Sequence, residues 1–176
     1  LGVAGVTDFV SMGLSDGGVA MMMMPMGMSL VLLYEELNAK TVAAGGSVDQ
    51  RAPNFALTLL LGIAYSASIG GVATLIGTPP NGVLVTQMSQ LFPSAPEFAF
   101  MTWMSFALPM SVVFLLASWL LLTRVVFPLP ASTPFSGKAF IAQEIEKLGP
   151  MTVEERRVLG VFITVAVLWM TRKERL

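Results

Sequence analysis

Cysteine and histidine are both absent from the 176 residues of this chain. Their absence excludes disulfide bonds, zinc sites built on Cys or His, and Ser-His or Cys-His catalysis within the chain. Charged residues are also scarce, since they make up only 12% of the sequence, about half of what a soluble domain carries. The net charge of −1 provides no basic face for a nucleic acid.

Apolar residues, in contrast, make up 55% of the chain and gather in long runs without a charge. These uncharged runs cover residues 17–34, 52–96, 98–123 and 158–171. A helix needs about 20 predominantly apolar residues to cross a bilayer, and the third run meets that requirement. The last run is shorter, but the arginines at its two ends can extend to the membrane surface. The pattern therefore predicts an all-α membrane protein.

The run at residues 52–96 is too long for one span and is interrupted by the pentapeptide Gly77-Thr78-Pro79-Pro80-Asn81. A proline has no amide hydrogen, so each proline here leaves the carbonyl four residues earlier without a helical partner. The residue before a proline also avoids helical angles. We therefore expect a discontinuous transmembrane helix over residues 53–92, built from helices at 54–76 and 80–91.

A second interruption lies near the beginning of the chain. Residues 1–14 are too few to span a bilayer and carry Asp8. The turn-forming sequence Ser15-Asp16-Gly17-Gly18 comes next, followed by a longer apolar run. Two apolar arms around a polar turn predict a re-entrant helical hairpin at residues 1–36. Such a turn at membrane depth has to be buried in protein or line a water-filled cavity.

Lysine and arginine assign the remaining loops to the two sides of the membrane. The loops at residues 37–52 and 129–157 carry these residues and are expected in the cytoplasm, the second with an amphipathic helix at 138–147. The connection after the broken helix has neither residue and is expected outside. Transmembrane helices are expected at residues 98–128 and 158–172, the second of them truncated.

Both interruptions leave backbone groups unpaired inside the membrane. The first amide groups of a helix carry partial positive charge and favour anions, while the last carbonyls favour cations such as sodium. Secondary transporters commonly build their binding sites from discontinuous helices of this kind. Because both interruptions also contain hydroxyl, amide or carboxylate oxygens, they predict a site for ions.

Three other features have a simpler interpretation as packing. The four methionines at residues 21–24 point all round a helix, which favours packing and lipid contact over a soft-metal site. A stripe of small residues, Ser66, Ser68, Gly70 and Gly71, favours close approach of helices over ligand binding. Asp8 is a functional candidate as an intramembrane acid, but we favour a position near the membrane surface.

Two stretches of the chain match a known pattern. One is Ser-Met-Gly-Leu-Ser-Asp-Gly at residues 11–17, followed by Met-Met-Met-Pro at 22–25, and the other covers residues 64–81. They resemble the first Ser-Asn-Thr hairpin and the broken-helix signature of the divalent anion–sodium symporter family, the sodium/dicarboxylate/sulfate symporters. The resemblance covers nearly the whole chain but only about the first half of a family member. We therefore expect a fragment.

The resemblance implies a secondary active transporter, not an enzyme, that moves di- or tricarboxylates or sulfate together with sodium by elevator-like alternating access. The chain would form one of two inverted repeats. Sodium would be held by Ser11, Ser15, Asp16 and Gly77. The substrate side of the site would comprise Asp16, Gly17, Thr78 and Asn81, with Asn81 bracing the turn. The resemblance also implies a homodimer in the lipid bilayer of the bacterial inner membrane.

The chain departs from the family's pattern in the hairpin. Asp16 stands in place of Asn, Gly17 in place of Thr, and Gly13 where Trp is common. A carboxylate is a good hard ligand for sodium, but it only accepts hydrogen bonds and repels an anion. Gly17 lacks the hydroxyl that should contact the substrate. Proton coupling through Asp16, and a non-transporting membrane scaffold with a degenerate hairpin, therefore remain open as alternatives.

An intramembrane aspartyl protease is the third alternative, with Asp8 and Asp16 as its two acids. Such an enzyme needs two carboxyl groups that come from separate helices and share a proton. Here both acids lie beside one turn, which disfavours this alternative.

Overall fold

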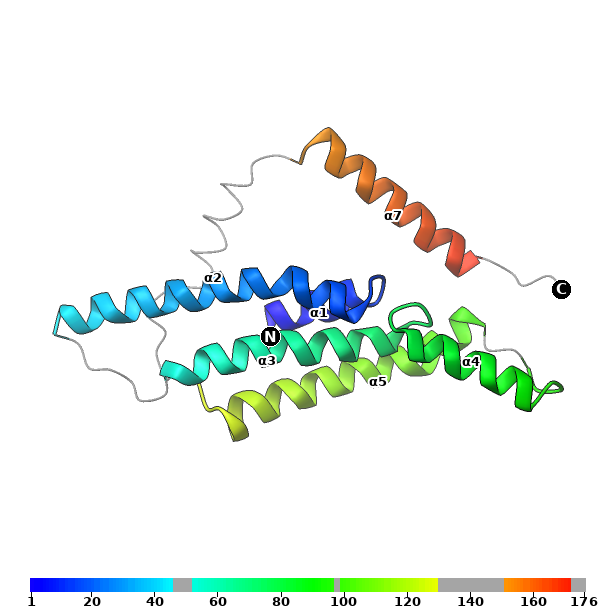
Figure 1. Ribbon diagram of the computed structural model, residues 1–176, viewed down its shortest axis with the longest axis horizontal. Coiled ribbons are helices and arrows are strands. Elements are labelled where there is room, and N and C mark those ends of the chain that lie inside the picture. Colours follow the sequence, from blue (N-terminus) through cyan, green and yellow to red (C-terminus); the bar gives the residue numbers. More distant parts are fainter. Residues whose placement is uncertain (46–51, 97–98, 130–150, 172–176) are drawn as a thin grey trace. The chain divides into compact units, whose positions relative to one another are not determined.

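The computed structural model describes residues 1–45, 52–96, 99–129 and 151–171, and every regular element in these ranges is helical (Figure 1). In chain order the elements are α1 (Gly2–Ser11), α2 (Asp16–Ala43), α3 (Ala52–Ala73), α4 (Pro79–Leu91), α5 (Phe100–Leu120), the short π-helix η1 (Leu121–Val126) and α7 (Val153–Thr171). Residues 1–131 form one compact unit and residues 132–176 a second. The unit that contains α1 to η1 carries the candidate site.

α3 is the central helix of the first unit, since α1, α2 and α5 all pack on it. Figure 1 shows α2 and α5 running along two sides of α3. Val19 and Met23 of α2 and Ile63 of α3 form a buried apolar cluster. Met23 is only 4% exposed, whereas Met21 is 74% exposed. The methionine run therefore places one side chain in the core and others on the outer surface, in agreement with the packing interpretation.

A tight turn joins α1 and α2. The amide groups of Gly13 and Leu14 both donate to the carbonyl of Val10, and α2 begins directly afterwards at Asp16. The expected hairpin ended at residue 36, but α2 continues to Ala43 as one helix despite its internal Pro25. The second arm is therefore long and apolar enough to cross a membrane by itself.

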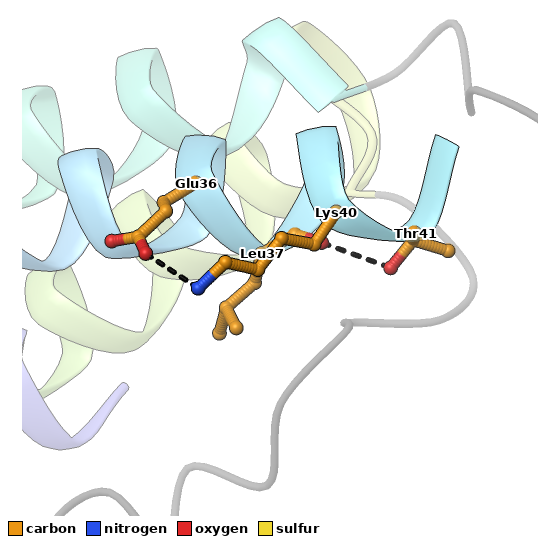
Figure 2. A network of polar contacts seen from close by, with 4 residues as sticks. All are labelled: Glu36, Leu37, Lys40 and Thr41. Atoms are coloured by element: carbon orange, nitrogen blue, oxygen red, sulfur yellow. Dashed lines mark hydrogen bonds and ion pairs between the residues drawn. The ribbon is translucent and has the colours of Figure 1, made fainter. Parts of the chain in front are cut away.

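The last turns of α2 are polar, as Figure 2 shows. The ammonium group of Lys40 lies 2.7 Å from the carboxylate of Glu36, and the Thr41 hydroxyl donates to the Leu37 carbonyl. Lys40, which was expected in a loop at residues 37–52, lies on the helix. Its positive charge is stabilised there by the partial negative charge of the carbonyl end of the helix. Residues 46–51 of that loop lie outside the described residues.

α3 ends at Ala73, earlier than the expected residue 76, and α4 begins at Pro79. The earlier end has a local cause. The Thr74 hydroxyl accepts a hydrogen bond from the Gly77 amide at 3.1 Å, and a continuous helix would use that amide for the carbonyl of Ala73. The turn at residues 74–78 therefore begins at a threonine, before the prolines take effect.

α5 and η1 form one long apolar segment where a span was expected at residues 98–128. After η1 the chain is tied back to the start of α3. The Asn54 side-chain amide donates to the Pro128 carbonyl at 3.0 Å, and the Thr58 hydroxyl donates to the Phe127 carbonyl at 3.3 Å. Residues 130–150, which include the expected amphipathic helix at 138–147, lie outside the described residues.

Among the described residues, three helical segments are long and apolar enough to cross a membrane, namely Asp16–Ala43, Pro53–Ala73 and Phe100–Val126. With their many exposed apolar side chains, such as Met21 and Val113, they identify the chain as part of an integral membrane protein. The expected span at residues 158–172 is not among the three. α7 begins with four charged side chains, residues 154–157, and the uncharged part that follows is too short.

Candidate ion-binding site

The turn between α1 and α2 lies against the second half of α3. Ser11, the last residue of α1, is fully buried, and its hydroxyl oxygen lies 2.6 Å from the Ala67 carbonyl. The same hydroxyl lies 3.2 Å from a carboxylate oxygen of Asp16, which begins α2 and is half-buried. Three oxygen atoms from three segments of the chain therefore meet at this point.

Two glycines allow this close approach. A β-carbon at Gly71 would collide with the Asp16 carboxylate. A β-carbon at Gly77 would lie 2.9 Å from the Ser11 carbonyl and 2.5 Å from the Gly71 carbonyl, closer than real side chains come. The structure therefore brings Ser11, Asp16 and Gly77 together, and it surrounds them with backbone carbonyls near the end of α3. Oxygen-rich sites of this kind suit hard cations.

Thr74 joins the two interruptions directly. Its side chain is buried, and its hydroxyl donates to the Met12 carbonyl at 2.5 Å while accepting from the Gly77 amide. One hydroxyl thus connects the α1–α2 turn with the break between α3 and α4. Thr74 lies inside the broken-helix stretch, but no role was predicted for it.

Asn81, in α4, forms hydrogen bonds across the break with backbone carbonyls at the end of α3. It is 7% exposed, and its side-chain nitrogen donates to the carbonyls of Gly71 at 2.9 Å and Thr74 at 2.7 Å. The indole nitrogen of Trp103, on α5, donates to the Val72 carbonyl at 3.0 Å. Because Asn81 uses both of its amide hydrogens on backbone carbonyls, the geometry supports a bracing role more than direct contact with an anion.

The other predicted site residues stand at the beginnings of helices. Ser15 precedes α2 and is exposed, Gly17 lies in its first turn next to open space, and Thr78 precedes α4. In the described part of the chain, no hydrogen bond connects the side chains of Ser15 or Thr78 with the Ser11–Asp16 pair. These residues flank the oxygen cluster at the beginnings of the two helices.

The structure buries Asp8 between helices, which concerns its place in the protein and not the depth in the membrane that the sequence predicted. Its side chain is 3% exposed, and its backbone packs so closely on Gly70 that a β-carbon there would collide with it. A carboxyl oxygen of Asp8 lies 3.3 Å from the Ser111 hydroxyl of α5, within hydrogen-bond distance. Asp8 therefore lies inside the helix cluster, away from its surface. The partner could not be identified from the sequence, because Ser111 lies 103 residues further along the chain.

The small-residue stripe serves close packing, as expected, although one member does not take part. Ser66, Gly70 and Gly71 are buried, and both glycines meet the α1–α2 segment, whereas Ser68 is exposed. The two acids of the protease alternative have separate partners, because the carboxyl group of Asp8 is hydrogen-bonded with Ser111 and that of Asp16 with Ser11. Among the described residues no hydrogen bond joins the two carboxyl groups, so the shared proton of an aspartyl dyad is not supported.

Comparison with known proteins adds independent information. The family model described as the sodium:sulfate symporter transmembrane region matches residues 18–175. The sodium-dependent dicarboxylate transporter SdcS of Staphylococcus saprophyticus is 33% identical over 173 residues, which cover 98% of this chain and 32% of that transporter. SdcS of Staphylococcus aureus strain NCTC 8325 matches with the same identity and coverage. The chain thus spans about a third of the length of these relatives, less than the expected half.

Proposed function

Because this chain belongs to the sodium:sulfate symporter family, we propose that it forms part of a sodium-coupled carrier for a small anion, either a di- or tricarboxylate or sulfate. Sodium is the coupling ion of the family. The two relatives are named as transporters, which supports a transport function for this chain. Since the chain spans about a third of their length, transport itself belongs to the complete protein.

One observation carries this proposal: the α1–α2 turn is packed into the break between α3 and α4. The contact brings a buried hydroxyl, a carboxylate and several carbonyls to one place, through the close approaches at Gly71 and Gly77. We assign sodium to this place, with Ser11, Ser15, Asp16 and Gly77 as its ligands. The carbonyl end of α3 favours a cation there, and Thr74 keeps the turn and the break together.

The anion is assigned to the neighbouring helix beginnings, with Asp16, Gly17, Thr78 and Asn81 around it. Asp16 stands in the first turn of α2, where the helix dipole favours its carboxylate. A bound sodium ion would neutralise this carboxylate and so permit an anion beside it. Gly17 supplies only its backbone amide, Thr78 supplies a hydroxyl, and Asn81 holds the turn in shape.

The proposal also covers the setting of the site. The α1–α2 segment would enter the membrane as a re-entrant hairpin, because α1 is too short to span it. α3 and α4 would form the discontinuous helix of one inverted repeat. The complete protein would be a homodimer in a bacterial plasma membrane, working by elevator-like alternating access.

The test is uptake by the complete protein in liposomes, with radiolabelled succinate, citrate and sulfate offered separately. An inward sodium gradient should drive uptake of one of them, and an equal potassium gradient should not. The matched variants are Gly71→Ala, which would displace Asp16, and Gly62→Ala, which meets open space on the same helix. Sodium binding without uptake of any of the anions would instead favour the non-transporting scaffold.

A further inference from the structure

Asp8 is a buried acid that the proposed transport site does not use. It lies in α1, one turn before Ser11, and α2, α3 and α5 pack around that helix. Its side chain is 3% exposed, and its backbone contacts Gly70 directly. An ionised carboxylate at such a position requires a cation or several hydrogen-bond donors.

The neighbouring helices provide no cation that could pair with it. α3 and α5 contain no Asp, Glu, Lys or Arg, and the titratable side chain of α3, Tyr65, is 52% exposed. The charged side chains of α2 are Asp16, Glu35, Glu36 and Lys40. Asp16 is itself an acid, and Lys40 is paired with Glu36 near the far end of the helix. Among the described residues, the side chain that contacts the Asp8 carboxyl group with a hydrogen bond is that of Ser111.

The Ser111 hydroxyl has fewer hydrogens than its two neighbouring acceptor oxygens require. The Ser111 oxygen lies 3.3 Å from a carboxyl oxygen of Asp8 and 3.2 Å from the Ile69 carbonyl of α3. A serine hydroxyl has one hydrogen and can fully serve only one of these acceptors. With an ionised Asp8, one of the two short contacts would therefore join two oxygens without a hydrogen between them. One additional hydrogen, carried by Asp8, satisfies both contacts.

We propose that the Asp8 carboxyl group binds a proton in the folded protein and donates it to the Ser111 hydroxyl, which donates in turn to the Ile69 carbonyl. The proton completes a chain of hydrogen bonds from α1 through α5 to α3. It also leaves the buried carboxyl group neutral, as its surroundings require. Loss of the proton leaves a buried charge and weakens the attachment of α1, the helix that leads into the α1–α2 turn.

Infrared spectroscopy of the complete protein in lipid nanodiscs tests the protonation directly. At neutral pH the wild type should show the carbonyl stretch of a protonated carboxylic acid, which shifts in heavy water. Asp8→Asn should remove this band. Glu36→Gln changes an exposed, ion-paired acid and should leave the band in place. Identical acid bands in the wild type and Asp8→Asn at neutral pH would overturn the proposal.

Thermal unfolding supplies a second measurement, which does not depend on transport. Asparagine has nearly the shape of a protonated Asp and can donate to Ser111, so Asp8→Asn should keep the wild-type Tm at neutral pH. As the pH rises, the wild type should lose stability because its folded form holds a proton that the unfolded form releases. Asp8→Asn should lose less. If Asp8→Asn fails to fold, or follows the wild type at high pH, Asp8 does not hold the proton.

Discussion

Two serine–aspartate pairs in this protein are built on the same plan and differ mainly in their burial. In each pair a buried serine hydroxyl lies between an aspartate and a carbonyl of α3: Ser11 between Asp16 and Ala67, and Ser111 between Asp8 and Ile69. Asp16 is half-buried at the beginning of a helix, whereas Asp8 is closed in between helices.

This difference in burial suggests different chemistry for the same two residue types. An ion arriving from water can reach a half-buried carboxylate, and the helix dipole stabilises its charge. Where the surrounding helices bring no cation close, neutralising a buried carboxyl group costs less free energy with a proton than with a metal ion, since a proton needs no further ligands. We therefore assign sodium to the half-buried outer pair, Ser11 and Asp16, and a proton to the enclosed inner pair, Ser111 and Asp8.

The largest effect on transport is expected from a substitution that fills the space beside the Asp16 carboxylate. Gly71→Ala places a methyl group on the Asp16 carboxylate, and relieving such a clash costs about 1–3 kcal/mol. We expect sodium-dependent uptake to fall ~5- to 100-fold, since ~1.4 kcal/mol corresponds to a factor of ten. Gly62→Ala is the control. Equal uptake by both variants would contradict the close approach at Gly71.

Replacing each serine with alanine should show that the two pairs have different functions. Ser11→Ala removes a hydroxyl of the outer pair and should weaken sodium binding about 5- to 10-fold, in line with the loss of ~1–1.5 kcal/mol for one hydrogen bond. Ser111→Ala should leave sodium affinity unchanged and lower the Tm. Isothermal titration of the complete protein with sodium chloride, together with thermal unfolding, measures both quantities. A similar loss of sodium affinity in both variants would show that the pairs are not separate sites.

A smaller effect is expected where the turn and the break are connected. Thr74→Val keeps the shape of the side chain but removes its hydrogen bonds to Met12 and Gly77, at a cost of ~1–2 kcal/mol in stability. Thr74→Ser retains the hydroxyl and loses only a buried methyl group, at a smaller cost of ~0.8 kcal/mol. Chemical unfolding of the two variants measures the difference. Equal destabilisation would mean that the methyl group matters and the hydroxyl does not.

The smallest expected effect concerns the dependence of transport on pH. If the outer pair binds sodium alone, wild type and Asp16→Asn should show the same shape of pH profile for uptake, even if their sodium affinities differ. A profile that becomes flatter in Asp16→Asn would instead support proton coupling through Asp16. Uptake measured from acidic to alkaline pH at saturating sodium distinguishes these outcomes.

Much of the candidate site could be located from the sequence, because its elements are local. The turn at Ser15 and Asp16, and the Pro-Pro break after Thr78, are visible as short patterns in otherwise apolar runs. The first and last residues of the helices were harder to predict from the sequence. α2 continues past residue 36 because a helix tolerates Glu36 and Lys40 on an exposed face, and α3 ends early because the Thr74 hydroxyl takes the Gly77 amide.

The sequence by itself determined that this is an all-helical membrane chain with two interrupted segments, since apolar run length and backbone-breaking residues are properties of neighbours along the chain. Only the tertiary structure decided which polar groups meet. Ser11 reaches Ala67, Thr74 reaches Met12, and Asp8 reaches Ser111 across long stretches of sequence. These contacts depend on how closely α1, α3 and α5 approach one another, and no local pattern encodes that distance.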